Sequence, residues 1–161
     1  MIGRNLSAHG LYKEFVSHGY IVFALDHMDE SCGYTERENG TPVHFARTAE
    51  SNTHESRFKM IKIRESEISA VIDEISEEGF LQNKLGFPDR VRLDMSKLIV
   101  SGHSFGGGTT LGVTAADSRV TASIPSDPWL WPYHKDINAL VCTTPTFIIR
   151  AETWYEWLRK R

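Results

Sequence analysis

The segment that most constrains this chain runs from Leu98 to Gly108, where an apolar run meets a glycine-rich helix pattern. At the junction stands a GxSxG motif with Ser104 at its centre. An apolar strand that stops at the first glycine, and a helix that starts after the last one, give the strand–turn–helix context that a nucleophilic serine needs. Such a sharp turn predicts strained backbone angles for Ser104 and an exposed hydroxyl. We also expect a side chain at either Gly102 or Gly106 to collide with the neighbouring strand and helix.

The rest of the chain predicts alternating strands and helices, which indicates an α/β protein with a mainly parallel sheet and flanking helices. Strands are expected in the apolar runs 20–25, 98–100, 120–124 and 146–149. Helices are expected from about 5 to 18, along the isoleucine stripe 61–75, over 106–116 and over 154–160. Residues 29–55 are polar and without periodicity, so we predict a long excursion there, functional or disordered.

Composition narrows the class of protein. The 161 residues are 40% hydrophobic and 24% charged, which fits one ordinary globular domain. A net charge of −3 argues against nucleic-acid binding driven by charge. No apolar run approaches the ~20 residues of a membrane-spanning helix, and the first residues show no signal core. The chain as given therefore leaves its localisation unknown.

A serine hydroxyl needs a base, and the base needs an acid that orients it. Asp127 ends the strand after the glycine-rich helix and should meet Ser104 at one sheet edge; the alternative is a turn aspartate before Pro128. The base is harder to find. We expect His103 to pack beneath the turn, and we interpret His134, the one histidine after Asp127, as a surface residue.

Other interpretations of the same residues are weaker. The motif could be a glycine-rich turn with an incidental serine. A nucleotide-binding βαβ unit is disfavoured because the glycines do not form GxGxxG. His27, Asp29, Glu30 and Cys32 share one short loop without zinc-site spacing, so we predict no metal site.

Several motifs together resemble those of the platelet-activating factor acetylhydrolases. The elbow Gly102-His103-Ser104-Phe105-Gly106-Gly107 is similar to the one in that family. So are the run 17–22 followed by Asp26-His27-Met28-Asp29, where the family usually has HRD, and the acid motif Ser126-Asp127-Pro128-Trp129. The resemblance covers most of the chain outside residues 29–55.

The resemblance implies an α/β-hydrolase fold without a cofactor, and cleavage of short or oxidised sn-2 acyl groups from phospholipids through an acyl-serine. Ser104 would be the nucleophile and Asp127 the triad acid. The backbone amides of Phe105 and Ile2 would form the oxyanion hole. The side chains that would line the acyl pocket are Trp129, Leu130 and Trp131.

In the family the histidine lies further along the chain than residue 161, and strands precede the oxyanion loop. We therefore expect a single partial α/β-hydrolase domain over residues 1–161, truncated at both ends and nearly inactive alone. The alternative is a non-catalytic remnant that binds lipid or a partner chain. Its tryptophan-rich end with Arg159, Lys160 and Arg161 could sit on a lipid surface.

Overall fold

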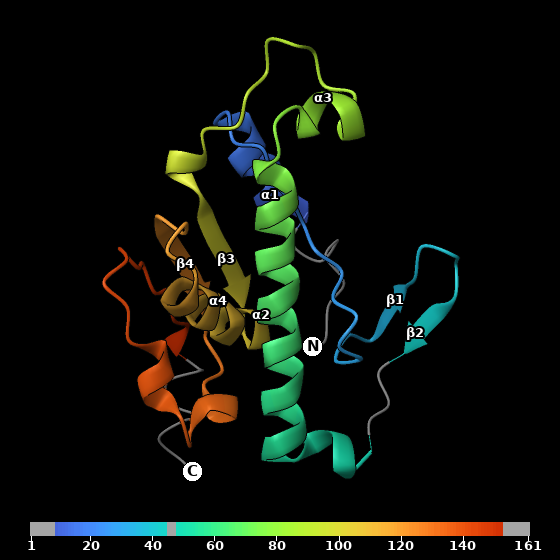
Figure 1. The fold of residues 1–161 in the computed structure, drawn as a ribbon. Coiled ribbons are helices and arrows are strands. Elements are labelled where there is room, and N and C mark those ends of the chain that lie inside the picture. Colours follow the sequence, from blue (N-terminus) through green and yellow to red (C-terminus); the bar gives the residue numbers. More distant parts are fainter. Residues whose placement is uncertain (1–8, 45–47, 153–161) are drawn as a thin grey trace.

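A computed structural model describes residues 9–44 and 48–152 of the chain. Two long helices and a small parallel sheet form its centre (Figure 1). In chain order the elements are α1 (His9–Ser17), β1 (Tyr34–Glu36), β2 (Pro42–His44), η2 (Glu50–Asn52), α2 (His54–Ser76), α3 (Phe80–Leu85), η3 (Met95–Lys97), β3 (Ile99–His103), α4 (Phe105–Ala116), β4 (Ala122–Ser126), η4 (Trp131–Tyr133) and η5 (Ile137–Leu140). The helix expected over 154–160 lies outside the described residues.

The parallel sheet is built from the C-terminal half of the chain. β3 pairs with β4 in parallel, in register from Ile99 with Ala122 to His103 with Ser126. The segment that follows η5 adds parallel bridges on the other side of β4, at Thr146 and Ile149. The strand expected over 146–149 is thus present as isolated bridges, and all three segments end at the same edge.

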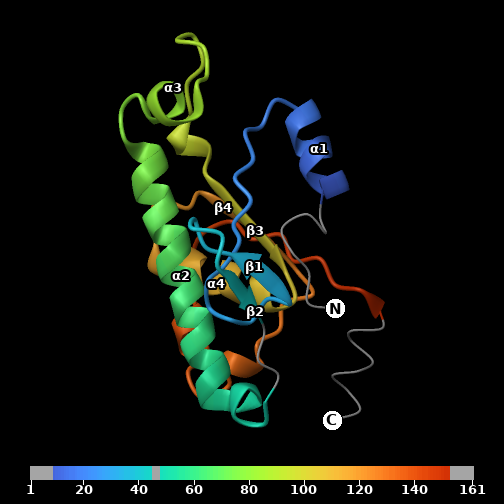
Figure 2. The ribbon, with the colours of Figure 1, turned by 90° about the vertical axis from the view of Figure 1, so that its right-hand side faces the viewer.

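The helices α2 and α4 cover one side of this sheet. α2 begins with a capping box, in which the Thr53 side chain accepts from the Ser56 amide and Ser56 reciprocates. Its isoleucine stripe points inward, because Ile61 and Ile72 are buried. Ile72 joins Val100, Val113 and Val120 in the core. Seen from the side, α1 lies across the β3–β4 pair from α2 (Figure 2).

The prediction of a buried strand over residues 20–25 is wrong. These residues follow α1 in an extended path without strand pairing. A strand exists only where a neighbour accepts its backbone hydrogen bonds. β3 pairs only with β4 within the part of the chain that the structure describes, so residues 20–25 have no strand partner there. Tyr20 and Ala24 are exposed, and the other four residues of the run are half-buried.

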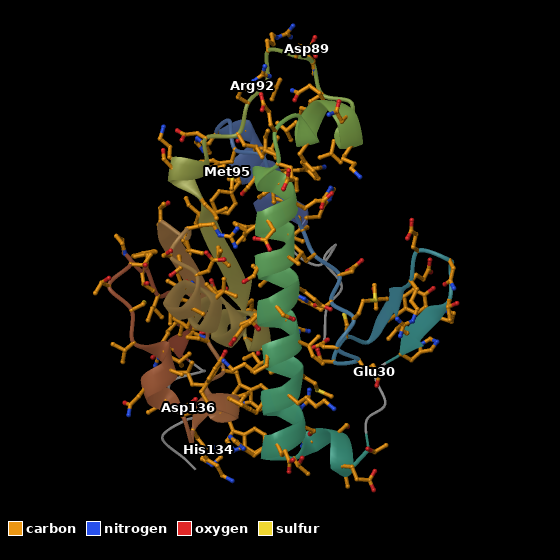
Figure 3. The ribbon with its side chains drawn as sticks, viewed as in Figure 1. Glu30, Asp89, Arg92, Met95, His134 and Asp136 are labelled. Carbon is orange, nitrogen blue, oxygen red and sulfur yellow. The ribbon has the colours of Figure 1, made fainter. Side chains whose placement is uncertain are left out.

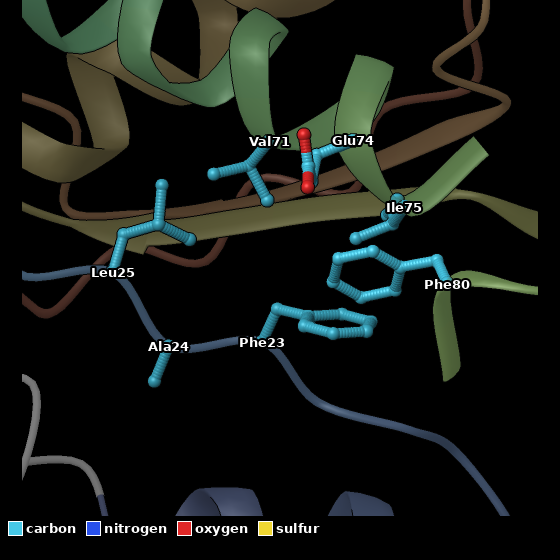
Figure 4. A pocket seen from close by; sticks show the side chains of 7 residues that line it. All are labelled: Phe23, Ala24, Leu25, Val71, Glu74, Ile75 and Phe80. Atoms are coloured by element: carbon cyan, nitrogen blue, oxygen red, sulfur yellow. The ribbon is translucent and has the colours of Figure 1, made fainter. Parts of the chain in front are cut away.

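A small apolar cavity adjoins this segment. It has a volume of about 240 Å³ and lies between the extended segment and the C-terminal part of α2 (Figure 4). Its lining residues are Phe23, Ala24, Leu25, Val71, Glu74, Ile75 and Phe80. The cavity shows that the side chains of the extended segment do not fill all the space between it and α2.

The polar excursion has more structure than the sequence predicted. Within residues 29–55, β1 and β2 form an antiparallel hairpin with Tyr34 opposite His44. The residues before the hairpin are tied to α2: Glu67 binds the His27 ring at 2.6 Å and the Met28 amide at 3.0 Å. No helix within 9–44 or 48–152 has both the length and the apolar character to cross a membrane.

Candidate active site

The predicted nucleophile lies in a strained turn between β3 and α4. Ser104 has φ 56° and ψ −113°, a left-handed conformation that costs a residue other than glycine roughly 1–3 kcal/mol. Its amide donates to the Ser126 carbonyl at 2.9 Å. Its own carbonyl accepts from the amides of Gly108 at 3.1 Å and Trp129 at 2.9 Å. The strained angles predicted for Ser104 are confirmed, and the backbone holds them on both sides.

Of the two glycines that flank Ser104, only Gly102 stands where a side chain would collide with its surroundings. A Cβ on Gly102 would lie 2.5 Å from the Gly106 carbonyl oxygen, so the strand and helix could not keep their distance. A Cβ on Gly106 would meet nothing within 4 Å, and the predicted collision there is wrong. No collision was predicted at Gly107, yet a Cβ on it would lie 2.9 Å from the Ser126 carbonyl oxygen.

Asp127 reaches the same sheet edge as Ser104, as the sequence predicted. The register pairs His103 with Ser126, so the residues that follow them leave the sheet side by side. Asp127 has φ 43°, and its Oδ1 accepts from the Ala151 amide at 2.6 Å. Its Oδ2 lies 3.6 Å from Nε2 of His103. The carboxylate is only 17% exposed, and its neighbours fix its direction.

The structure does not assign a base. His103 was expected beneath the turn, but its side chain is 69% exposed and faces Asp127, because β3 ends at the sheet rim. His134 is exposed at the end of η4, as predicted. All seven histidines are among the described residues, and none of them hydrogen-bonds the Ser104 hydroxyl there. Ser104 and Asp127 thus follow neighbouring strand ends, and Asp127 faces His103.

The amide of Phe105 has the character of an oxyanion donor. Phe105 is the first residue of α4, where no carbonyl of the helix can accept its N–H and the helix dipole favours negative charge. The other expected donor, Ile2, lies outside the described residues.

Aromatic side chains extend from Phe105 along the loop after β4. The Phe105 and Trp129 rings lie 5.8 Å apart, and Trp129 stacks on Trp131 at 5.6 Å. Leu130, between the two tryptophans, is half-buried, and Trp131 is 39% exposed. We call Trp129, Leu130 and Trp131 the aromatic wall. The wall adjoins Phe105 at the elbow, and its role in lining an acyl pocket stays a prediction.

Sequence reasoning missed the support that α2 gives to the elbow. The guanidinium carbon of Arg64 lies 4.7 Å from the centre of the Phe105 ring, a cation–π distance. Arg64 Nε also binds the fully buried Asp29 carboxylate at 2.6 Å, and Ser31 donates to both oxygens of that carboxylate. A buried aspartate predicts a cationic partner, but nothing in the sequence points to this arginine.

A second contact joins α2 to the loop of the aromatic wall. The Tyr133 hydroxyl is buried and donates to Glu65, which also binds Lys62 at 2.8 Å. Burial, followed by the Glu65 carboxylate, raises the pKa of Tyr133 above its ordinary range. The phenol therefore stays protonated and anchors η4.

The acidic loop before the hairpin is occupied by these structural contacts. His27 binds Glu67 and Asp29 binds Arg64. Within the described ranges, no three His, Cys, Asp or Glu side chains come together in a way that could hold a metal ion.

Most of the chain is similar to known platelet-activating factor acetylhydrolases. The family model described as platelet-activating factor acetylhydrolase, isoform II, matches residues 4–159. A platelet-activating factor acetylhydrolase of Cavia porcellus is 30% identical over 159 residues, and one of Bos taurus is 25% identical over 157. Each alignment covers 86% of this chain and 35% of the relative. The chain thus spans about a third of the length of these relatives.

A second group of relatives matches a shorter stretch. Cutinase 1 of Thermobifida cellulosilytica is 40% identical over 70 residues, which is 44% of this chain and 25% of the cutinase. Both groups of relatives carry the names of hydrolases.

Proposed function

The chain belongs to the family of platelet-activating factor acetylhydrolases, isoform II, and from that premise we propose that it carries the nucleophile and the acid of a serine esterase. Family membership and the cutinase relatives imply an α/β-hydrolase fold. The observation that carries the proposal is the strained Ser104, set beside Asp127 at the edge of two paired parallel strands.

In the proposed reaction the Ser104 hydroxyl attacks the acyl carbonyl while a histidine base takes its proton. The negative charge that develops on the carbonyl oxygen is stabilised by the Phe105 amide. The C–O bond to the leaving alcohol then breaks, and the histidine returns the proton to that oxygen. Water hydrolyses the acyl-serine by the same steps in reverse, with Asp127 orienting the histidine throughout.

The proposed substrate is a phospholipid with a short or oxidised sn-2 acyl chain. Family membership supports the phospholipid class. The aromatic wall supports the short chain, because Trp129 and Trp131 are large rings close to the elbow.

We further propose that this chain alone turns over ester substrates slowly. No histidine of the chain hydrogen-bonds the Ser104 hydroxyl in the part that the structure describes. Removal of one triad member costs on the order of 10⁴-fold in turnover. A free imidazole could then take the place of the base.

The experiment measures labelling of Ser104 by a short-chain fluorophosphonate, followed by peptide mass spectrometry, with and without added imidazole. We expect slow labelling that imidazole accelerates, and none in Ser104→Ala. Asp127→Asn should lose most of the imidazole effect, whereas Asp136→Asn, an exposed control, should keep it. Labelling of other serines at the same rate would refute the assignment. Fast turnover without imidazole would make His103 or His134 the base.

A non-catalytic role as a binding partner has one observation in its favour. Apolar side chains after η5 are exposed, Val141 by 76% and Phe147 by 68%. The basic, tryptophan-rich end proposed for lipid contact lies outside the described residues. Co-sedimentation with phosphatidylcholine–phosphatidylserine vesicles, with Phe147→Ser as the variant, tests this role. Absence of binding at low salt would remove the lipid version of it.

A further inference from the structure

Two histidines from distant parts of the chain meet beside the aromatic wall. His54 is the first residue of α2 and His134 follows η4, and their ring centres are 3.9 Å apart at 85°. His134 also stacks on Trp131 at 6.3 Å, and His54 meets the same ring edge-on at 5.6 Å. Figure 3 shows His134 beside the N-terminal end of α2. The pair therefore joins α2 to the loop that carries the aromatic wall.

The enclosed position of one ring nitrogen favours the neutral form of His54. His134 Nδ1 lies 3.0 Å from the Trp131 carbonyl oxygen, and because a carbonyl only accepts, Nδ1 carries the proton. His54 bonds the Pro132 backbone, while its Nε2 is enclosed and has no hydrogen-bond partner among the described residues. A second proton on His54 would go to that enclosed nitrogen, where nothing accepts it.

Burial and the positive charge nearby also favour the neutral His54 ring. Burial, then His134 and Lys135, lower the pKa of His54 below its ordinary value of 6.5, against a smaller opposing effect of the Pro132 hydrogen bond. The acidic neighbours on either side are exposed to solvent, where their charges are screened. They are Glu50, Glu55 and Asp136. A state with the pair separated thus binds protons more readily than the closed state.

The sign of the pH effect follows from this difference. Because the pKa of His54 is lower in the closed state, the contact keeps its full stability above pH 6.5 and loses it as the pH falls below that value. A protonated His54 would also be repelled by Lys135.

We propose that His54 and His134 are positioning residues that hold the aromatic wall against α2 while the His54 ring is neutral, and release it when that ring is protonated in acid. The importance of the wall for substrate rests on the proposed function. The stack from His134 through Trp131 and Trp129 reaches Phe105, which follows Ser104. Release would widen the space beside the nucleophile and admit longer acyl chains.

Tryptophan fluorescence of the full chain between pH 8 and pH 5 tests the release. We expect an emission change with a midpoint below pH 6.5, because protonation of His54 separates the pair and changes the surroundings of Trp131. The double variant His54→Phe, His134→Phe keeps flat rings but cannot titrate, so it should lose the change. His18→Phe, at an exposed histidine directly after the far helix α1, should retain it. Far-UV circular dichroism verifies that the chain stays folded.

A transition that persists in the double variant, or a folded wild-type chain without one, would overturn the proposal. If the double variant does not fold, nitrogen-15 spectra of the wild-type imidazoles decide. They should show His134 protonated on Nδ1 and His54 titrating below pH 6.5; titration of His54 at or above 6.5 contradicts the proposal.

A second readout separates this proposal from the proposed function. The ratio of Ser104 labelling by long-chain and short-chain fluorophosphonates should rise at least threefold below the transition in the wild type, and stay constant in the double variant. Fluorescence does not depend on Ser104 chemistry, and Ser104→Ala should keep the emission change. A normal fluorescence transition without any Ser104 labelling would therefore refute only the esterase. Labelling whose chain-length ratio ignores pH would refute only the release of the wall.

Discussion

Residues 99–129 and residues 20–31 both lie against α2, but they are held by different kinds of interaction. In the first region backbone groups bind one another: the Ser104 amide binds the Ser126 carbonyl, and the Trp129 amide binds the Ser104 carbonyl. In the second region two side chains of α2, Glu67 and Arg64, hold the segment from outside. Backbone bonding fixes a path whatever side chains the residues carry, whereas a segment held by side chains depends on a few charged groups.

The largest expected effect breaks the side-chain attachment. Arg64→Met leaves the buried Asp29 carboxylate without its cation, and breaking such a pair typically costs about 3–5 kcal/mol. Urea unfolding of the variant measures this loss. Glu14→Gln, which removes an exposed pair with His18, should change the free energy of unfolding by less than about 0.5 kcal/mol. A loss below 1 kcal/mol in Arg64→Met would mean that the attachment does not depend on this pair.

A pair of glycine variants tests the backbone-held region. Gly102→Ala places a methyl group 2.5 Å from the Gly106 carbonyl oxygen and should destabilise the chain by about 1–3 kcal/mol. Gly106→Ala meets open space within a helix and should be neutral or stabilising by up to about 1 kcal/mol. Urea unfolding compares the two. Equal losses would show that space at the elbow is not what distinguishes them.

Hydrogen exchange sharpens the contrast between the regions directly. The amides of Ser104, Asp127 and Trp129 donate to backbone carbonyls, whereas residues 21–25 have no strand partner among the described residues. We expect exchange of the three bonded amides to be at least about tenfold slower, equivalent to 1.4 kcal/mol. Equal protection in residues 21–25 would show that this segment is paired in solution.

The smallest expected effect concerns a turn in the backbone-held region that does depend on side chains. Arg119 binds Asp117 between α4 and β4, and its hydrogen bonds lower the pKa of that carboxyl below 3.8. The stabilisation is therefore present above pH 3.8 and is lost as the pH falls below it. Asp117→Asn should cost less than about 1 kcal/mol at pH 7 and nothing near pH 2, by urea unfolding. The exposed control Asp89→Asn should show no such pH dependence.

The same contrast explains what could be predicted from the sequence. The elbow was predictable because its determinants are local: Gly102 and Ser104 stand where an apolar strand pattern meets a glycine-rich helix pattern. Asp127 was predictable because parallel strands end at one edge. The apolar run 20–25 was mistaken for a strand, since residue type indicates suitability for a sheet but not the presence of a partner.

Contacts between residues far apart in the sequence could not be predicted from it. Asp29 and Arg64 are 35 residues apart, and no periodicity connects them. The meeting of His54 and His134 likewise depends on where α2 begins relative to η4. Such contacts follow from the packing of whole elements, which a single sequence does not encode in any local pattern.

The way in which Asp127 is held has a consequence for protein engineering. Its amide donates to the Ile149 carbonyl, and its carboxylate accepts from the Ala151 amide, so the outer edge segment sets the direction of the acid. A ligand-responsive domain inserted after Ala151 would pull on the acid without touching the serine. The edge segment is thus a place at which a ligand could be made to control the orientation of Asp127.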